Sequence, residues 1–295
     1  MSEENRDLSR RVFLASAGVA AAGTAATPAW DALAEVRKYR KIDSHNHVFL
    51  SPRQTPRAVV EAADRLSIER LVVSLPRGDT PEGFRAANDT VLKAMKEYPD
   101  RLLGQCFLNP AYPREAMDEM SRCMDLGMVG LGELYTQVKI NDQLYYPFIE
   151  KSIEMKSPIL MHARADLGLL RPGHRTEAPP TTSVASDFVE AARRYPEAIL
   201  IHGHIGGGGD WEYMCKTLRD CPTIYIDTSG SVSDEGMIDF ALRYLGPERL
   251  LFATDLNFES GVGKILAADL TEQQRRMIFF DNYNSILRKR GLHAR

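Results

Sequence analysis

Eight short apolar runs alternate with amphipathic stretches along most of this 295-residue chain, and this alternation limits the folds open to it. Most of the runs are apolar on both faces, as the strands of a helix-covered parallel sheet must be. Eight such units close most naturally into a (β/α)8 TIM barrel, and an open doubly wound sheet is the alternative. The expected strands lie at 41–48, 68–75, 101–108, 128–135, 158–163, 198–203, 222–228 and 249–254. The expected helices lie near 56–66, 82–98, 113–126, 143–156, 183–195, 210–219, 234–245 and 271–289.

Five of the seven histidines lie at or just past the ends of these runs, and an aspartate ends another run. Side chains at the carboxyl ends of parallel strands point into a common mouth, where α/β enzymes keep their chemistry. Histidine and aspartate are ligand types that suit an ion such as Zn²⁺. The strands concerned can share one centre only if the sheet closes, which favours a barrel-shaped, metal-dependent enzyme. The residues are His45, His47, His162, His202, His204 and Asp255.

The N-terminal residues 1–34 read as an export signal rather than as part of the fold. Arg10 and Arg11 precede the Ala/Gly-rich stretch VFLASAGVAAAGTAA, and Ala32-Leu33-Ala34 offers a small-x-small cleavage site. This order resembles a bacterial twin-arginine signal, and an uncleaved amphipathic helix is the alternative. The stretch is too short and too rich in glycine and alanine for a membrane span. We expect a periplasmic or secreted protein, exported folded by the twin-arginine machinery, without stable membrane insertion.

The remaining residues, 35–295, match the roughly 250 residues of a typical TIM barrel, so one domain accounts for them. A net charge of −3 and a pI near 6.2 give no electrostatic case for nucleic acid as a partner. The four cysteines lack C-x-x-C spacing, which argues against a cysteine zinc site. An oxidising periplasm would allow Cys215 and Cys221 to pair, whereas cytoplasmic folding favours free thiols. The expected partner is a small-molecule substrate, and a homo-oligomer is compatible with this composition.

Residues two apart on a strand have their side chains on the same face of the sheet, which predicts how neighbouring candidate ligands are oriented. His45 and His47 therefore point the same way. His202 is expected on the face of His204, one pleat deeper, either as a buried partner or as a residue that touches substrate.

Several motifs within residues 41–288 together resemble the amidohydrolase superfamily, specifically the amidohydrolase-related family with aminocarboxymuconate-semialdehyde decarboxylase-like proteins. They are I-D-S-H-N-H, P-I-L-M-H, H-I-G-G, Y-I-D-T-S-G and L-F-A-T-D, at the first, fifth, sixth, seventh and eighth strands. The resemblance implies one divalent ion, Zn²⁺ or Mn²⁺, and a proton-carrying His204 beside its bound water. An ion with an open position lowers the pKa of that water toward neutrality. The implied ligands are His45, His47, His162 and Asp255, with His204 and Asp255 as the catalytic residues.

Glu133, in the segment GLGELY that ends the fourth strand, departs from this pattern. The metal-dependent deoxyribonuclease branch of the superfamily has a bridging glutamate at this place. Glu133 is therefore a candidate ligand that would bring a second ion, with His204 among the ligands of that ion. Otherwise it is a substrate-facing acid, an inward residue held by Arg164, or a surface residue. One ion is favoured, since H-x-G-G and L-F-A-T-D resemble the decarboxylase-like family more closely.

Arg164 is the expected substrate residue, because arginine is the usual fork for a carboxylate. Arg171, His174 and Arg175 follow it in the long connection 165–181, which is a functional lid or a solvated loop. The predicted function is hydrolysis of an amide, lactone or other ester of a small carboxylate-bearing substrate by metal-activated water. A non-oxidative decarboxylase of the same fold is the alternative, and a non-enzymatic exported metal-binding protein is the third possibility.

Overall fold

The computed structural model describes residues 32–135, 137–164 and 179–293. The chain divides into two units, Met1–Ala34 and Glu35–Arg295, and the fold below is that of the second unit. None of the described helices is both long enough and apolar enough to span a membrane.

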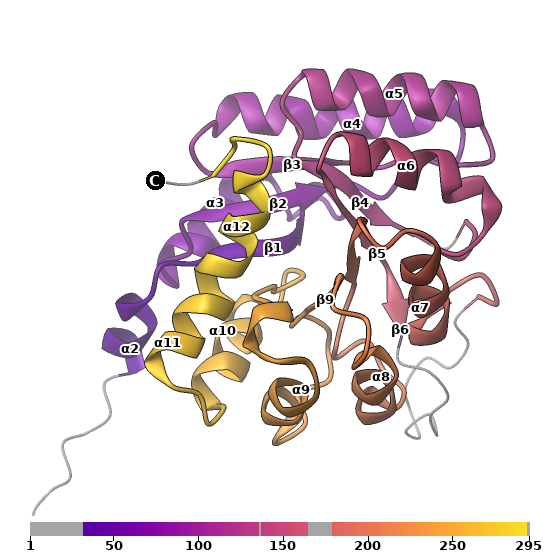
Figure 1. Cartoon of the computed structure of the whole chain (residues 1–295). Helices are drawn as coiled ribbons and strands as arrows, with labels where there is room; N and C mark the ends of the chain where they lie inside the picture. The colour runs from indigo at the N-terminus through magenta and orange to yellow at the C-terminus, as the bar shows by residue number, and fades with distance from the viewer. Residues whose placement is uncertain (1–31, 136, 165–178, 294–295) are drawn as a thin grey trace, which may run out of the picture. The chain divides into compact units, whose positions relative to one another are not determined.

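Eight parallel strands form one sheet in the order β1-β2-β3-β4-β5-β8-β9-β10, so each strand pairs with the next of these eight (Figure 1). Ser44 N donates to Phe252 O and Asp255 N donates to His45 O, both at 2.9 Å, so the first strand also meets the segment after the last. The sheet is thus a nearly closed barrel, and the predicted TIM barrel is confirmed. The strands are β1 Ile42–His47, β2 Arg70–Ser74, β3 Leu102–Cys106, β4 Gly130–Leu134, β5 Pro158–Met161, β8 Ile199–His202, β9 Ile224–Asp227 and β10 Leu250–Leu251.

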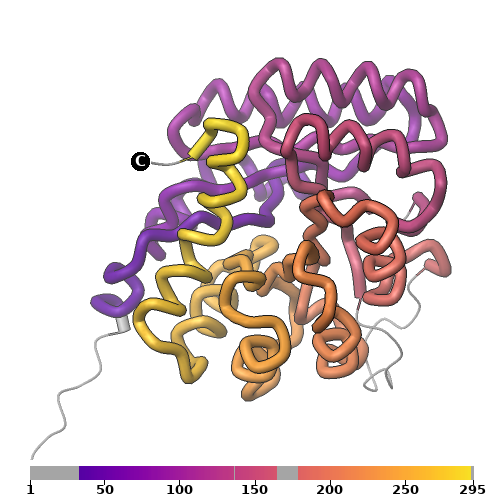
Figure 2. The backbone as a smooth tube through the Cα atoms, viewed as in Figure 1, coloured from indigo at the N-terminus to yellow at the C-terminus, as the bar shows by residue number. Residues whose placement is uncertain are grey.

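Helices follow the strands and form the outer layer around them (Figure 2). They are α2 Ala32–Lys38, α3 Pro56–Arg65, α4 Pro81–Glu97, α5 Pro113–Asp125, α6 Tyr146–Glu154, α7 Ala185–Arg194, α8 Trp211–Leu218, α9 Met237–Leu245, α10 Phe258–Ala267, α11 Glu272–Arg276 and α12 Asn282–Arg288. Short 3₁₀ turns span Gln143–Tyr145 and Pro247–Arg249, and a π-helical turn spans Met277–Asp281. A separate parallel pair, β6 Ala163–Arg164 and β7 Ser183–Val184, follows β5.

Threonine-proline pairs start two of these helices in the way that the sequence signals. Thr55 and Thr80 cap α3 and α4, and each hydroxyl accepts a hydrogen bond from a backbone N–H of the first turn, at 3.2 Å. The following prolines occupy the first helical position, where a missing N–H costs no helical bond. Both helix starts are therefore encoded locally.

The end of the chain differs from the expectation. Helix α10 was not predicted, because the two glycines in FESGVGKILA lower its helix propensity. Burial of Phe258, Val262 and Ile265 against the barrel overrides that local cost. The helix expected at 271–289 is interrupted by the π-helical turn, and the eighth strand pairs over only two residues.

Candidate metal centre

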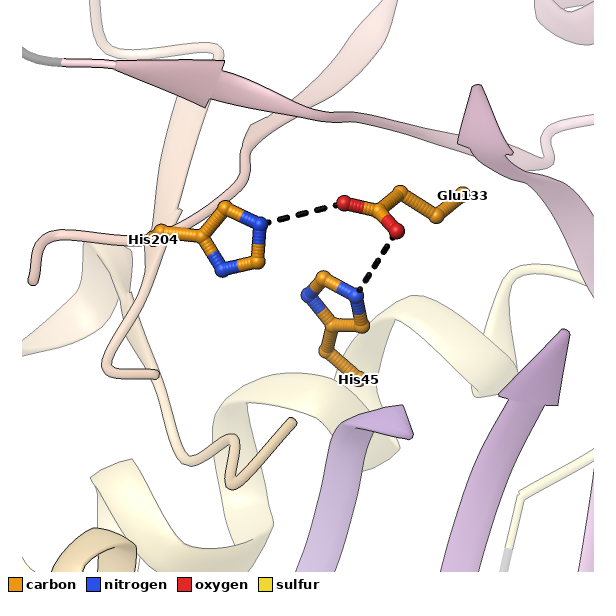
Figure 3. Close-up of side chains that lie close together, drawn as sticks. All are labelled: His45, Glu133 and His204. Carbon is orange, nitrogen blue, oxygen red and sulfur yellow. Dashed lines mark hydrogen bonds and ion pairs between the residues drawn. The ribbon is translucent and has the colours of Figure 1, made fainter. Parts of the chain in front are cut away.

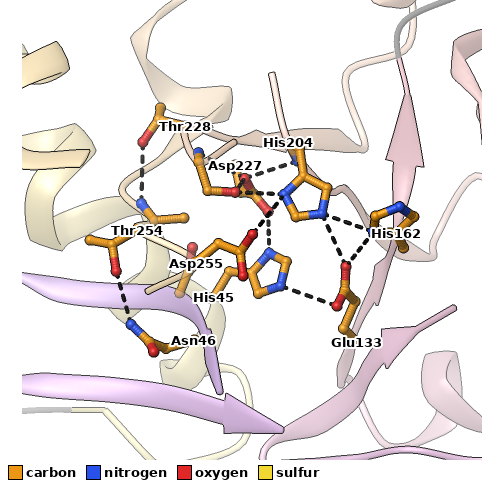
Figure 4. Close-up of polar contacts among 12 residues, drawn as sticks. His45, Asn46, Glu133, His162, His204, Asp227, Thr228, Thr254 and Asp255 are labelled. Carbon is orange, nitrogen blue, oxygen red and sulfur yellow. Dashed lines mark hydrogen bonds and ion pairs between the residues drawn. The ribbon is translucent and has the colours of Figure 1, made fainter. Parts of the chain in front are cut away.

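The carboxyl ends of the barrel strands carry one cluster of imidazoles and carboxylates (Figure 4). All the metal ligands proposed from the sequence lie in it, together with an aspartate that received no role there. The members are His45 and His47 of β1, Glu133 of β4, His162 after β5, His204 after β8, Asp227 of β9 and Asp255 after β10.

Glu133 occupies the middle of the cluster, and its side chain is only 3% exposed. Its Oε1 lies 2.8 Å from His162 Nδ1 and 3.1 Å from His204 Nε2. Its Oε2 lies 3.5 Å from His45 Nε2 and 3.4 Å from His47 Nε2. Figure 3 shows the carboxylate between His45 and His204. Each oxygen of Glu133 therefore faces its own pair of histidines.

Asp255 borders the same cluster from the end of the last strand. Its Oδ1 lies 3.1 Å from His47 Nε2, and its Oδ2 lies 3.8 Å from His204 Nδ1. Asp255 and His204 both have left-handed backbone conformations, with φ of 46° and 68°. Such conformations are costly for residues other than glycine and gather at functional sites, where the surrounding structure maintains them.

Asp227 sets the proton positions on two of the imidazoles. Its Oδ2 accepts a hydrogen bond from His45 Nδ1 at 2.7 Å. The Ser229 hydroxyl donates to Asp227 Oδ1, so its oxygen accepts the 2.8 Å hydrogen bond from His204 Nδ1. Both rings consequently carry hydrogen on Nδ1 and turn Nε2 toward Glu133. Sequence reasoning missed Asp227 and Ser229, although the motif Y-I-D-T-S-G placed both at a strand end.

Opposite charges outweigh burial at Glu133 and His45, whereas burial prevails at His162 and lowers its pKa. Burial opposes ionisation of Glu133, yet His45 and His162 hold its pKa well below the ordinary value. Burial also acts to lower the pKa of His45, but Glu133 and Asp227 hold it well above its usual range. The three carboxylates thus depend on nearby positive charge, and a divalent cation can supply that charge in place of imidazole protons.

The donor atoms fit a divalent metal. His45 Nε2 is buried and has no hydrogen-bond partner among the described residues, as expected for a nitrogen that awaits an ion. The 3.1, 3.4 and 3.5 Å separations around His47 and Glu133 Oε2 resemble the roughly 3.4 Å between tetrahedral ligands held about 2.1 Å from Zn²⁺. Two overlapping sets bring their donor atoms within 4.8 Å of one another, namely His45–His47–Asp255 and His45–Glu133–His204.

A buried polar network joins the first strand to the last behind this centre. Asp43 accepts hydrogen bonds from the Thr254 backbone N–H, the Thr254 hydroxyl and the Asn46 amide, at 2.6–3.0 Å. Asn46 also donates to the Thr254 hydroxyl, as Figure 4 shows. The network holds the β1 histidines in register with Asp255.

His202 does not join the cluster. It ends β8, is fully buried, and packs against Phe188 of α7 with ring centroids 4.8 Å apart. Neither ring nitrogen has a hydrogen-bond partner in the described part of the chain, and burial lowers its pKa to about 4. The expectation that it shares a face with His204 is not met, because the chain leaves the strand after His202 and turns left-handed at His204.

Arg164 lies on β6 beside the mouth and is half-buried. Its charge reaches Tyr135, where it opposes the rise in pKa that burial and Glu133 cause. The Tyr135 ring packs against His162 at a tilt of 39°, with centroids 4.3 Å apart. Arg164 is therefore close to the centre without binding it. Arg171, His174 and Arg175 lie outside the described residues.

Comparison with known proteins gives a family and several structural neighbours. The family model described as Amidohydrolase matches residues 42–282. A 2-keto-4-carboxy-3-hexenedioate hydratase from Sphingobium sp. is 23% identical over 256 residues, which cover 70% of this chain and 74% of that protein.

Two solved structures illustrate the shared fold. The 2,6-dihydroxybenzoate decarboxylase from Rhizobium has a TM-score of 0.67 at 20% identity, covering 86% of this chain and 100% of that one. A dihydroxybenzoic acid decarboxylase from Polaromonas sp. JS666, with bound manganese and 2-nitroresorcinol, has a TM-score of 0.65 at 20% identity, covering 85% and 97%. At such identities the likeness is one of fold.

Proposed function

The chain belongs to the amidohydrolase family, whose model matches residues 42–282, and on this basis we propose that it is a metal-dependent hydrolase. The substrate is an amide, lactone or other ester of a small carboxylate-bearing molecule. The position of Glu133 carries the proposal, because its two oxygens face two separate pairs of histidines. A carboxylate so placed suits two adjacent ions, and paired ions are typical of hydrolytic enzymes.

We assign the donors to two ions, which departs from the single ion that the sequence favoured. Glu133, His45, His47 and Asp255 would hold one ion, and Glu133, His162 and His204 would hold the other. The Nδ1 hydrogen on His204 supports its place as a ligand, because Nε2 is then the nitrogen that would release its hydrogen and bind an ion on the side of Glu133. Zn²⁺ and Mn²⁺ both accept this donor set.

Bound divalent ions would supply a Lewis acid for the carbonyl oxygen of the substrate and would lower the pKa of a water molecule. Asp255 is the residue placed to move protons, since its side chain is 26% exposed while those of His47 and Glu133 are 2% and 3% exposed. Burial acts to raise the pKa of Asp255, but His47, His45 and His204 together lower it, which keeps the carboxylate ionised. With Oδ1 turned to His47, Oδ2 is the atom that accepts a proton from attacking water and returns it to the leaving group.

The carboxylate of the substrate is assigned to Arg164. Arg164 lies on β6, and its charge acts on Tyr135, a residue that is 40% exposed and whose ring contacts His162. An arginine at this position orients a carboxylate through paired hydrogen bonds and keeps the reacting bond over the cluster.

A decarboxylase is the second candidate, and the names of the structural neighbours support it. Two of them are decarboxylases of hydroxybenzoates, and the curated relative is a hydratase, so lyase chemistry occurs on this fold. In that case one ion is held by His45, His47, His162 and Asp255. His204 then transfers a proton to the carbon that loses carbon dioxide.

Metal content tests the two-ion assignment. The protein is loaded with Zn²⁺ or Mn²⁺, desalted and analysed for bound metal. We expect two ions per chain, and Glu133→Gln should weaken both sites because a neutral amide replaces the shared carboxylate. Glu197→Gln, at an exposed position between α7 and β8, is the matched control and should bind as the wild type does. One ion in the wild type, retained in Glu133→Gln, would contradict the assignment.

A substrate panel tests the reaction class. Carboxylate-bearing lactones, esters and amides are compared with hydroxybenzoates, and acid release and carbon dioxide are measured separately. Hydrolysis of a lactone, ester or amide, lost in Asp255→Asn, is the expected result. Carbon dioxide release without any hydrolysis would favour the decarboxylase and overturn the hydrolase.

We also propose that residues 1–34 direct export by the twin-arginine route. The proposal depends on Arg10, Arg11 and the apolar stretch that follows them, and residues 1–31 lie outside the described structure. Replacing both arginines with lysine should leave the precursor in the cytoplasm. An unchanged amount of shortened protein in the periplasm would contradict it.

A further inference from the structure

Lys264 of α10 binds the loop that follows β9. Its ammonium donates to three successive backbone carbonyls, those of Thr228 at 3.3 Å, Ser229 at 3.4 Å and Gly230 at 2.8 Å. Carbonyl oxygens that converge in this way repel one another unless a cation lies between them. Lys264 therefore stabilises a conformation of residues 228–230 that repulsion between their carbonyl oxygens would otherwise disfavour.

The same loop packs tightly on the loop after β8, which carries His204. Gly230 has a φ of +97°, and a Cβ atom there would lie 2.3 Å from the backbone of Gly206. Gly206 N donates to Ser229 O, and Val232 N donates to Gly206 O, both at 3.0 Å. The two loops are consequently fixed to each other by close packing and two backbone hydrogen bonds.

Two side chains lead from this loop into the metal centre. Ser229 Oγ lies 2.8 Å from His204 Nδ1, and Asp227 accepts hydrogen bonds from both the backbone N–H and the hydroxyl of Ser229. Asp227 also binds His45 Nδ1 and the backbone N–H of His204. The backbone carbonyls of residues 228–230 thus bind Lys264. The Ser229 hydroxyl binds His204, and the Asp227 carboxylate binds His45.

We propose that Lys264 is a positioning residue of the metal centre. By binding the carbonyls of residues 228–230, it holds Ser229 and Asp227 where they keep hydrogen on Nδ1 of His204 and His45. Both Nε2 atoms then stay directed at Glu133 and ready to bind metal. The expected effect on turnover rests on the proposed hydrolase function, whereas the effects on the imidazoles and on metal affinity do not.

The surroundings of Lys264 suit this role. Burial lowers the pKa of Lys264 to about 8, although the negative charges of Asp227 and Asp255 limit the decrease. The side chain is therefore mainly a charged ammonium at neutral pH. Lys264 also lines a cavity of about 440 Å³ next to α9 and α10. Replacement side chains of similar length therefore have room.

The test compares Lys264→Met, which removes the charge, with Lys264→Arg, which keeps it. Lys93→Met, an exposed lysine on α4, is the matched control. The first measurement is nitrogen NMR of the ¹⁵N-histidine-labelled protein saturated with Zn²⁺, which reports which ring nitrogen carries hydrogen and which binds the ion. The second is the Kd for Zn²⁺, measured by competition with a chromophoric chelator. The third is kcat and KM, on the substrate found in the panel.

In Lys264→Met we expect His204 to lose its preference for hydrogen on Nδ1 and the Kd for Zn²⁺ to rise about tenfold, the lower end of losses typical of residues that orient ligands. The kcat should fall while KM stays near the wild-type value, because substrate contacts are untouched. Lys264→Arg should recover most of each property, and Lys93→Met should change none of them.

A lower Tm with unchanged imidazole signals and unchanged Zn²⁺ affinity would show that Lys264 only supports the fold, and would overturn the proposal. If Lys264→Met does not fold, Lys264→Gln provides the same comparison with a neutral donor. If no substrate is hydrolysed, the proposed function fails, but the NMR and Zn²⁺ measurements still decide the role of Lys264.

Discussion

Asp227 Oδ2 lies 2.7 Å from His45 Nδ1, and both side chains are completely buried. This hydrogen bond leaves His45 Nε2 as the nitrogen that faces Glu133 at 3.5 Å. His45 belongs to both overlapping donor sets of the cluster, so Asp227, which is a member of neither set, influences both through His45.

The first prediction follows from this contact. Asp227→Asn keeps the shape of the side chain but removes the charge that stabilises hydrogen on His45 Nδ1. Metal affinity should fall about 10–100-fold, as is usual when the partner of a ligand histidine is lost. Competition with a chromophoric chelator measures it, and Asp220→Asn, an exposed site after α8, is the control. Unchanged affinity would mean that Asp227 does not orient His45.

The two pairs of histidines should be separable by metal analysis. His47 faces one oxygen of Glu133 and His162 faces the other. His47→Ala and His162→Ala should each lose one of two ions, and the double variant should lose both. His293→Asn, outside the cluster and exposed, should retain the wild-type content. Two ions retained in His162→Ala would remove this residue from the ligand set.

His202 should be dispensable for activity. It packs on Phe188 and is held neutral by burial, so His202→Leu replaces a buried polar ring with an apolar side chain. Loss of an unpaired buried polar group stabilises the protein, whereas loss of the ring contact with Phe188 destabilises it, so the free energy of unfolding should change by less than about 1 kcal/mol. Metal content and kcat should stay near wild type. A large loss of kcat with normal metal content would restore His202 as a substrate residue.

Lys41 should make stability depend on pH in the alkaline range. It is fully buried and donates to the carbonyls of Val36 and Tyr39, and burial lowers its pKa to about 8. Between that pH and the ordinary lysine value, the unfolded chain binds the proton and the folded protein does not. Stability from this group therefore rises with pH across the window.

Comparison with Lys41→Met isolates the effect of this lysine. The difference in free energy of unfolding, wild type minus variant, should increase by about 1–3 kcal/mol from pH 8 to pH 10.5, since one pKa unit corresponds to about 1.4 kcal/mol. Denaturant titrations at each pH measure it. A difference that is constant over this range would show that Lys41 is not desolvated.

Metal removal should weaken the protein without unfolding it. The barrel buries a large apolar core that includes no cluster residue, so the chelated protein should keep its far-UV circular dichroism. Addition of Zn²⁺ or Mn²⁺ at about 100 times Kd should stabilise it by about 2.7 kcal/mol for each ion bound and raise the Tm. The rise should be smaller in Glu133→Gln. If the metal-free protein were unfolded, the prediction that the barrel folds without bound metal would be wrong.

The barrel and the mouth could be predicted because both follow from local patterns. Apolar runs bounded by turn residues define strands, and the carboxyl ends of parallel strands meet at one face. The positions of His45, His47, His162 and His204 at these ends were enough to predict a shared centre. Helix α10 was missed for a local reason, since its glycines conceal a helix that only burial stabilises.

Tertiary structure alone decided which atom faces which. Asp227 and His45 are 182 residues apart, and their contact depends on the register of the barrel strands. Strand parity predicted one face for His202 and His204, but the left-handed turn at His204 separates them. The sequence by itself determined the fold and the ligand types, because periodicity and strand ends are local properties. Only the tertiary structure decided which imidazole nitrogens carry hydrogen and that each oxygen of Glu133 faces a different pair of histidines. Both depend on side chains from distant strands, which lie close together only when the sheet closes into a barrel.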